Sequence, residues 1–219
     1  MRDRVLPFYV VCDESYSMTD HMDTLRARLR ELHTCIRTNP VVSTLVRFCL
    51  IGFADTARLV VPLCAPHDLD DIGTFSTRAA SNFGAAFTLL RETIERDVAE
   101  LRAQSYDIRR PTVFFLSDGQ PTDPAMWQQP YARLVEPAWS DRPKIVAFGV
   151  GDADPATIRA VGQFKAFVAD QNGGTTSGEA LHQFAQALAD SMLSTAVSTD
   201  RIKLPEQVRG YTALSTRCR

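Results

Sequence analysis

Residues 10–20 read VVCDESYSMTD, a stretch that joins an apolar run to a group of small polar side chains. Residues 5–12 are almost continuously apolar, which is typical of a strand buried on both faces of a parallel sheet. The run stops at Asp13, and two serines follow at alternate positions, Ser15 and Ser17. One carboxylate and two hydroxyls therefore stand at the end of a buried strand.

Strands and helices alternate along the rest of the chain. Five further apolar runs predict strands, at residues 45–54, 57–63, 111–117, 144–150 and 164–169. Apolar residues at helical spacing predict helices at residues 21–37, 86–101 and 178–195, the last one after a capping-box pattern at 176–179. Asp-Pro pairs predict two more helix starts, at 123–124 and at 154–155.

This order of elements, β-α-β-β-α-β-α-β-α-β-α, predicts an α/β fold with a doubly wound, mostly parallel six-stranded sheet and helices on both faces. The strand at 57–63 follows a short turn, so we expect it to be antiparallel and to lie at an edge, where Pro62 is tolerated. We expect residues 1–197 to form one domain. The tail, residues 198–219, has little periodicity and is either an extra strand or flexible.

Composition and charge argue against several classes of partner. The chain has 219 residues and a net charge of −2, and its arginines are scattered, so we expect no binding of nucleic acid. No apolar run approaches the length of a membrane span, so we expect no membrane insertion. Five cysteines without a CxxC pair favour a reducing, cytoplasmic location, and the four separated histidines lack zinc-ligand spacing.

Two more polar groups stand beside predicted elements. Ser81 directly precedes the long helix within AASNFGAAF, and Asp118 ends the strand at 111–117 within LSDGQPTD. Ligands of doubly wound sheets bind outside the carboxyl ends of the strands. If the first strand and the strand at 111–117 are neighbours, Asp13 and Asp118 lie close together.

Asp13 and Asp118 would then form a pair of carboxylates, which repel each other unless a cation or a proton lies between them. Ser15, Ser17 and Ser81 would add neutral oxygens, and such an all-oxygen set suits Mg²⁺ or Mn²⁺ better than soft-ligand metals. Each residue alone also has a purely structural interpretation. Aspartate and serine are good helix caps, and serine and Asp-Gly pairs are common in turns.

The combination of these motifs resembles the von Willebrand factor A family. Asp-x-Ser-x-Ser ends the first strand, a hydroxyl residue precedes a later helix, and Asp-Gly ends the fourth strand. In that family these residues form the metal-ion-dependent adhesion site, and the resemblance covers residues 5–196. The stretches LSDGQPTDPAMW (116–127) and VPLCAPHDLDDIGTF (61–75) look like the bacterial tellurium-resistance proteins of the TerY-like type.

The resemblance implies a role for each matching residue. Ser15 and Ser17 would coordinate the ion directly through their hydroxyls. Asp13 and Asp118 would act directly or through bound water. Ser81 takes the place of the usual threonine and keeps its oxygen.

The chain departs from the family pattern just before Ser81, where two glycines are usual and Ala79 and Ala80 stand instead. Alanine tolerates positive φ poorly, so this loop is where the site is expected to differ. In the family the ion leaves one coordination position for an Asp or Glu carboxylate of a partner protein. The resemblance therefore implies non-catalytic, metal-dependent protein binding, as a scaffold in a bacterial stress or tellurium-resistance system with a phosphatase and a kinase.

An enzymatic alternative is a haloacid-dehalogenase-like, Mg²⁺-dependent phosphohydrolase that uses Asp13 as its nucleophile. That chemistry needs a second acid two residues later, as general acid, and Ser15 stands there. It also needs a well-placed lysine, and the chain has only Lys144, Lys165 and Lys203. These residues favour the binding module over the enzyme.

Overall fold

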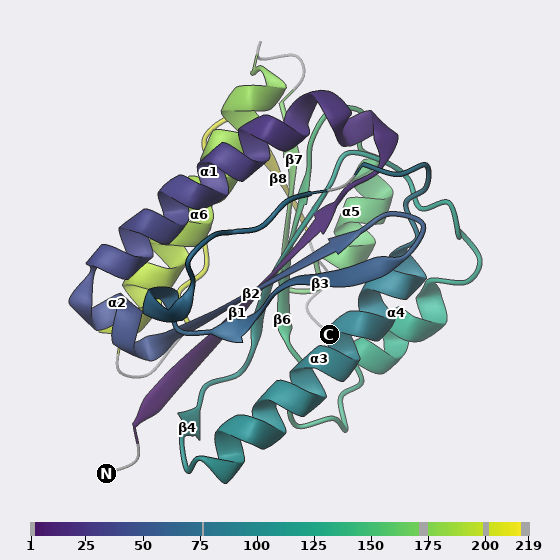
Figure 1. Ribbon diagram of the computed structural model, residues 1–219. Helices are drawn as coiled ribbons and strands as arrows, with labels where there is room; N and C mark the ends of the chain where they lie inside the picture. The colour runs from purple at the N-terminus through teal and green to yellow at the C-terminus, as the bar shows by residue number, and fades with distance from the viewer. Residues whose placement is uncertain (1–2, 76, 171–174, 199–201, 216–219) are drawn as a thin grey trace.

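The computed structural model describes residues 3–75, 77–170, 175–198 and 202–215, and its elements follow the predicted alternation (Figure 1). The strands are β1 (Arg4–Asp13), β2 (Val46–Phe53), β3 (Ala57–Cys64), β4 (Asp107–Ile108), β5 (Thr112–Ser117), β6 (Lys144–Gly149), β7 (Lys165–Ala169) and β8 (Tyr211–Leu214). The α-helices are α1 (Thr19–Thr38), α2 (Pro40–Leu45), α3 (Phe83–Ala103), α4 (Gln128–Leu134), α5 (Pro155–Val161) and α6 (Ser177–Val197). Two short 3-10 helices are η1 (Tyr16–Met18) and η2 (Pro66–Asp68).

The sheet has the strand order β3-β2-β1-β5-β6-β7-β8. The five central strands are parallel, and β3 and β8 are antiparallel to their neighbours at the two edges. The mostly parallel α/β sheet with an antiparallel β3 is therefore confirmed. The expected number of six strands is wrong, because β8 adds a second antiparallel edge and the two-residue β4 pairs with the start of β1.

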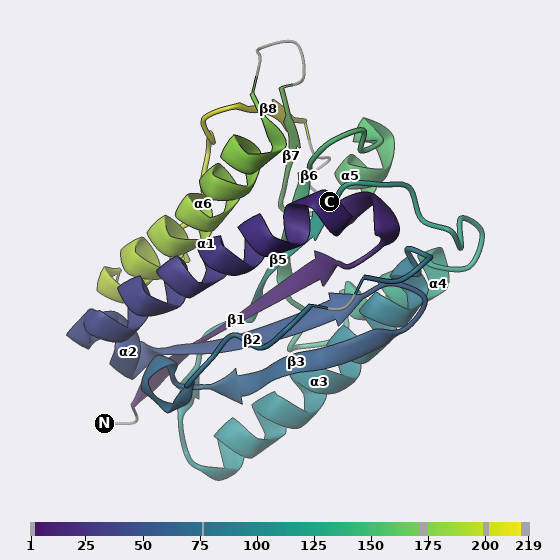
Figure 2. The same ribbon diagram turned by 45° about the horizontal axis from the view of Figure 1, so that its top comes forward.

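Helices cover both faces of the sheet (Figure 2). One face packs against α1, α2 and α6, and the other against α3, α4 and α5. Alternate side chains of β1 enter the two cores, with Phe8, Val10 and Cys12 on the first face and Tyr9 and Val11 on the second. Because β1 is buried on both faces, its carboxyl end is held firmly in the middle of the sheet.

Two of the predicted helix starts are confirmed and one is wrong. Asp154 caps α5, and the capping box Thr176–Glu179 begins α6. The start predicted at Asp123-Pro124 does not exist, since α4 begins only at Gln128. The Asp123 carboxylate instead accepts hydrogen bonds from the first two amides of α3, a helix distant in sequence.

The tail contains an ordered strand. Residues 211–214 pair with β7 as β8, and the buried Tyr211 donates its hydroxyl to the carbonyl of Ala180 in α6 at 2.9 Å. Four residues are too few for periodicity to reveal a strand. The parts of the tail at 199–201 and 216–219, including Cys218, lie outside the described residues.

A short helix, α2, was not expected. Asn39 caps it by accepting hydrogen bonds from the amides of Val41 and Val42, but two adjacent valines favour a strand on propensity. Across the helices that the structure describes, none is long and apolar enough to span a bilayer.

Candidate metal centre

Three loops meet at the carboxyl ends of β1 and β5. The parallel register pairs Cys12 with Leu116, so Asp13 and Ser117 end the two strands side by side, and Asp118 follows directly. The expectation that these two strands are neighbours is confirmed. The topology therefore brings two carboxylates to one edge of the sheet, where doubly wound folds bind ligands.

Asp13 is fully buried, and three hydrogen bonds hold its carboxylate. The Ser15 amide donates to Oδ1 at 3.0 Å, the Ser81 hydroxyl donates to Oδ1 at 3.4 Å, and the Ser117 hydroxyl donates to Oδ2 at 2.7 Å. Burial raises the pKa of Asp13 to about 6, although the hydrogen bonds from Ser117 and Ser15 lower it. The charged carboxylate is therefore costly at this position unless a cation balances it.

Asp118 and the two motif serines complete the cluster. The hydroxyls of Ser15 and Ser17 share a hydrogen bond of 3.1 Å, and Ser17 donates to Oδ1 of Asp118 at 3.1 Å. Asp118 is only 7% exposed, and burial raises its pKa against the opposing effect of the Ser17 hydrogen bond. Because Ser17 is exposed, the cluster reaches the surface on this side.

Helix capping does not explain these side chains. The N-cap of α1 is Met18, without a side-chain hydrogen bond, so Asp13 caps no helix there. The N-cap of α3 is Asn82, one residue after Ser81. Ser15 occupies the N-cap position of η1 but makes no side-chain capping bond. The structure thus brings all five predicted site residues together and leaves their oxygens directed at one another.

The stretch directly before Ser81 contains no glycine. Within the described ranges, Ser105 is the one non-glycine residue with a positive φ, so Ala79 and Ala80 adopt ordinary backbone conformations. The Ser81 carbonyl also accepts a hydrogen bond from the Thr122 amide at 3.0 Å, which ties this loop to the one after β5. The two alanines therefore introduce no backbone strain.

Two residues that shape the site were missed in the sequence. Ser117 had a usable signal, because it precedes Asp118 and the parallel register places it beside Asp13. Asp123 had none, because it resembles a cap for its own helix. Its carboxylate accepts bonds of 3.1 and 2.8 Å from the amides of Phe83 and Gly84 and so fixes the start of α3 next to Ser81.

The donor set fits a hard divalent cation. Across the residues that the structure describes, neither Asp13 nor Asp118 makes an ion pair with lysine or arginine. The same residues contain no group of three or more His, Cys, Asp or Glu side chains placed to hold a metal. Two carboxylates and three hydroxyls form the all-oxygen environment that Mg²⁺ and Mn²⁺ prefer.

The fold and the cluster define a class of α/β domain with Asp-x-Ser-x-Ser at the end of its first strand and an acidic loop beside it. A model of the von Willebrand factor type A domain family matches residues 8–177. The chain belongs to this family. No match was found among curated proteins.

Solved structures share this fold at low sequence identity. The pilus adhesin SpaC from Lactobacillus rhamnosus GG, in an open conformation, has a TM-score of 0.64 at 12% identity, covering 88% of this chain and 30% of the adhesin. Proximal thread matrix protein 1 from the mussel byssus, with a zinc-occupied MIDAS motif, has a TM-score of 0.60 at 14% identity, covering 88% and 48%. The ArnB paralog VWA2 from Sulfolobus acidocaldarius has a TM-score of 0.55 at 16% identity, covering 87% and 46%. This chain therefore spans less than half the length of each.

Proposed function

We propose that this domain is a metal-dependent protein-interaction module without catalytic activity of its own. Asp13, Ser15, Ser17, Ser81 and Asp118 hold Mg²⁺, or Mn²⁺, at the carboxyl edge of the sheet. The observation that carries this proposal is the convergence of two buried carboxylates and three hydroxyls, with no ion pair from a described lysine or arginine to either carboxylate. The mussel matrix protein, whose MIDAS motif holds zinc, supports a metal role for this edge of the fold.

The bound ion would supply an electrophilic point for a partner's carboxylate. Asp13 and Asp118 provide the negative charge that retains the cation, and the serines provide neutral oxygens that leave part of its charge unbalanced. An Asp or Glu of a partner protein then replaces a water molecule and gains a charge-assisted contact. The exposed Ser17 marks the side from which this carboxylate arrives.

We further infer that the protein is a scaffold in a bacterial stress or tellurium-resistance system, alongside a phosphatase and a kinase. The support is the likeness of residues 61–75 and 116–127 to the TerY-like branch. A cytoplasmic, reducing location agrees with the free thiols of the described cysteines, Cys12, Cys35, Cys49 and Cys64. We assign the interaction module to residues 1–197.

Phosphohydrolase chemistry has less support from the geometry. Lys144 and Lys165 begin β6 and β7, so they stand at the amino ends of strands whose carboxyl ends carry the site. Ser15 holds the position at which that chemistry needs an acid. A generic phosphoester should therefore not be turned over by the wild-type protein in the presence of Mg²⁺.

A peptide array tests the proposed function directly. Peptides that present Asp or Glu in varied contexts are compared with matched peptides that carry Asn or Gln, each with Mg²⁺ and with a chelator. We expect binding that needs both the metal and the acid, and that Asp118→Asn abolishes. Binding that ignores the metal, or that tolerates the amide peptides equally, would refute a metal-mediated contact.

A further inference from the structure

Glu14, which lies between Asp13 and Ser15, is a buried carboxylate that the metal cluster does not use. Its side chain is 2% exposed, and its backbone amide donates to the carbonyl of Phe53 at 2.7 Å. A carboxylate withdrawn from water is costly unless it is both paired and hydrogen-bonded. The position of Glu14 therefore depends on specific partners.

Arg58 of the edge strand β3 is the main partner. Its Nη2 donates to Oε1 of Glu14 at 2.5 Å, and its Nε donates to Oε2 at 3.3 Å. The same Nη2 donates to the carbonyl of Thr74 at 2.7 Å. One guanidinium group thus joins the end of β1 to the segment that leads to Ser81.

Gly52 of β2 provides the space for this ion pair. A Cβ atom at Gly52 would lie 2.5 to 2.7 Å from the three atoms of the Glu14 carboxyl group, which is too close for any side chain. Gly52 lies between Cys12 of β1 and Arg58 of β3 in the ladder. The glycine and the ion pair therefore form one unit across three neighbouring strands.

The segment before α3 touches the end of β1 at a second point. The Arg78 amide donates to the Glu14 carbonyl at 3.0 Å, and Ser15 and Arg78 form an isolated parallel bridge. Apart from this bridge, the described residues between η2 and α3 contain no helix or strand, so the path of the segment depends on such anchors. Ser81 follows three residues after Arg78.

We propose that the Glu14–Arg58 ion pair is a positioning device for the metal site. It holds Thr74 and residues 77–81 near the end of β1 so that the Ser81 hydroxyl faces the Asp13 carboxylate. This inference rests on the proposed function, and it assigns a role to a motif residue that is not itself a ligand.

The direction in which Arg58→Gln changes Mg²⁺ affinity distinguishes a positioning role of the ion pair from a purely electrostatic role. Arg58→Gln removes a positive charge next to the metal site, so a purely electrostatic role predicts tighter Mg²⁺ binding. Positioning predicts weaker binding, by about 10-fold or more, as is typical when groups that orient metal ligands are lost. The Mg²⁺ dissociation constant, measured by calorimetry, decides between the two.

A double variant guards against misfolding of the single one. Glu14→Gln with Arg58→Gln removes both charges, so it leaves no unpaired buried charge and does not change the net charge. We expect this variant to fold, to bind Mg²⁺ about 10-fold more weakly than wild type, and to exchange its amides at residues 77–82 faster.

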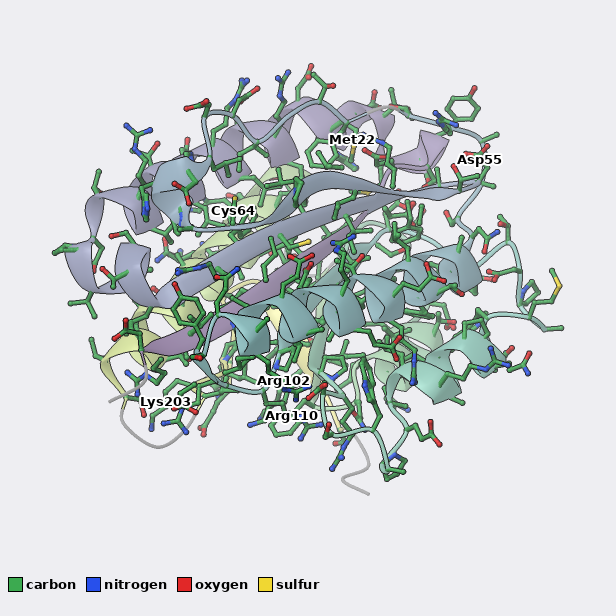
Figure 3. The ribbon with its side chains drawn as sticks, turned by 60° about the horizontal axis from the view of Figure 1, so that its bottom comes forward. Met22, Asp55, Cys64, Arg102, Arg110 and Lys203 are labelled. Atoms are coloured by element: carbon green, nitrogen blue, oxygen red, sulfur yellow. The ribbon has the colours of Figure 1, made fainter. Side chains whose placement is uncertain are left out.

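Arg102→Gln is the matched control. Arg102 also makes a two-bond pair with an acid, Asp141, at 2.9 and 2.5 Å. This pair lies in the last turn of α3, about 30 Å along that helix from its start beside Ser81. Figure 3 shows Arg102 well away from Asp55, which lies in the β2–β3 turn at the site end of the sheet. This variant should leave Mg²⁺ affinity unchanged.

The possible failures are distinguishable. If the wild-type protein binds no Mg²⁺, the metal site itself is refuted, and this inference with it. If the wild type binds Mg²⁺ but Arg58→Gln binds it as well or better, or the double variant is unchanged, only the positioning role is overturned.

Discussion

The hydroxyl of Ser117, at the end of β5, donates a 2.7 Å hydrogen bond to Oδ2 of Asp13, at the end of the neighbouring parallel strand β1. Both side chains are fully buried, and each is the last residue of its strand. The bond fixes the orientation of Asp13, the more deeply buried of the two cluster carboxylates. It thereby links the ends of β1 and β5 at the cluster.

Ser117→Ala should raise the pKa of Asp13 further, because the lost hydrogen bond favours the charged carboxylate. Protons then compete with Mg²⁺ up to higher pH, so the pH at which Mg²⁺ affinity is half lost should move upward. Stability should fall by about 1–3 kcal/mol. Calorimetry across a pH series measures this shift. The control, Ser191→Ala, removes a buried hydroxyl from α6 and should lower stability without changing the pH dependence of Mg²⁺ affinity.

The metal-free protein should lose stability as pH rises through the pKa of Asp13. Burial raises that pKa from 3.8 to about 6, so the folded state binds the proton more tightly than the unfolded chain does. The contribution of Asp13 to the free energy of unfolding is fully present below its pKa in the unfolded chain. About 3 kcal/mol of it is lost as the pH rises past its pKa in the folded protein. Asp13→Asn should therefore be more stable than wild type at neutral pH in a chelator, and urea unfolding at acidic and neutral pH checks this. Equal pH dependence in both proteins would contradict it.

The Ser81 hydroxyl, rather than the shape of its side chain, should matter for the metal. Ser81→Thr keeps the oxygen and should retain Mg²⁺ affinity within a few-fold, whereas Ser81→Ala should weaken it by about 10-fold or more. Both variants should unfold within about 1 kcal/mol of wild type, because the hydrogen bond to Asp13 is long at 3.4 Å. Equal Mg²⁺ affinity for the threonine and alanine variants would remove Ser81 from the ligand set.

Asp123→Ala should affect both stability and the metal site. The change leaves two amides of α3 without their acceptor, which should cost about 1–2 kcal/mol in urea unfolding. It should also weaken Mg²⁺ binding, since the neighbouring Thr122 amide bonds to the Ser81 carbonyl. Asp154→Ala removes a comparable cap from α5 and should lower stability without changing Mg²⁺ affinity.

The sequence was sufficient to predict the central parallel strands and to predict that the five polar residues lie together at one edge of the sheet. Long apolar runs such as 5–12 and 111–117 show buried strands, and the rule that parallel strands present ligands at their carboxyl ends then brings Asp13 and Asp118 together. Apart from Asp123, capping signals were reliable where the cap is local, as at Asp154.

Two other contacts between distant segments, those of Asp123 and of Glu14, could not be predicted. Asp123 has the local appearance of a helix start, yet it caps α3, forty residues earlier, because the two loops meet only in the folded sheet. Glu14 likewise looks like a spacer between Asp13 and Ser15. Its pairing with Arg58 depends on which residues of β2 and β3 face each other, and on the space that Gly52 leaves for the Glu14 carboxyl group. The sequence indicates neither of these two features.

Titration of the wild-type protein and of Asp13→Asn with Mg²⁺, side by side in a calorimeter, tests the central claim most directly. Asp141→Asn, an acid far from the cluster, is the control. We predict saturable binding to the wild type and to the control, and none to Asp13→Asn. Wild-type and Asp13→Asn proteins that bind Mg²⁺ equally, or a wild type that does not bind it at all, would contradict a metal centre at the end of β1.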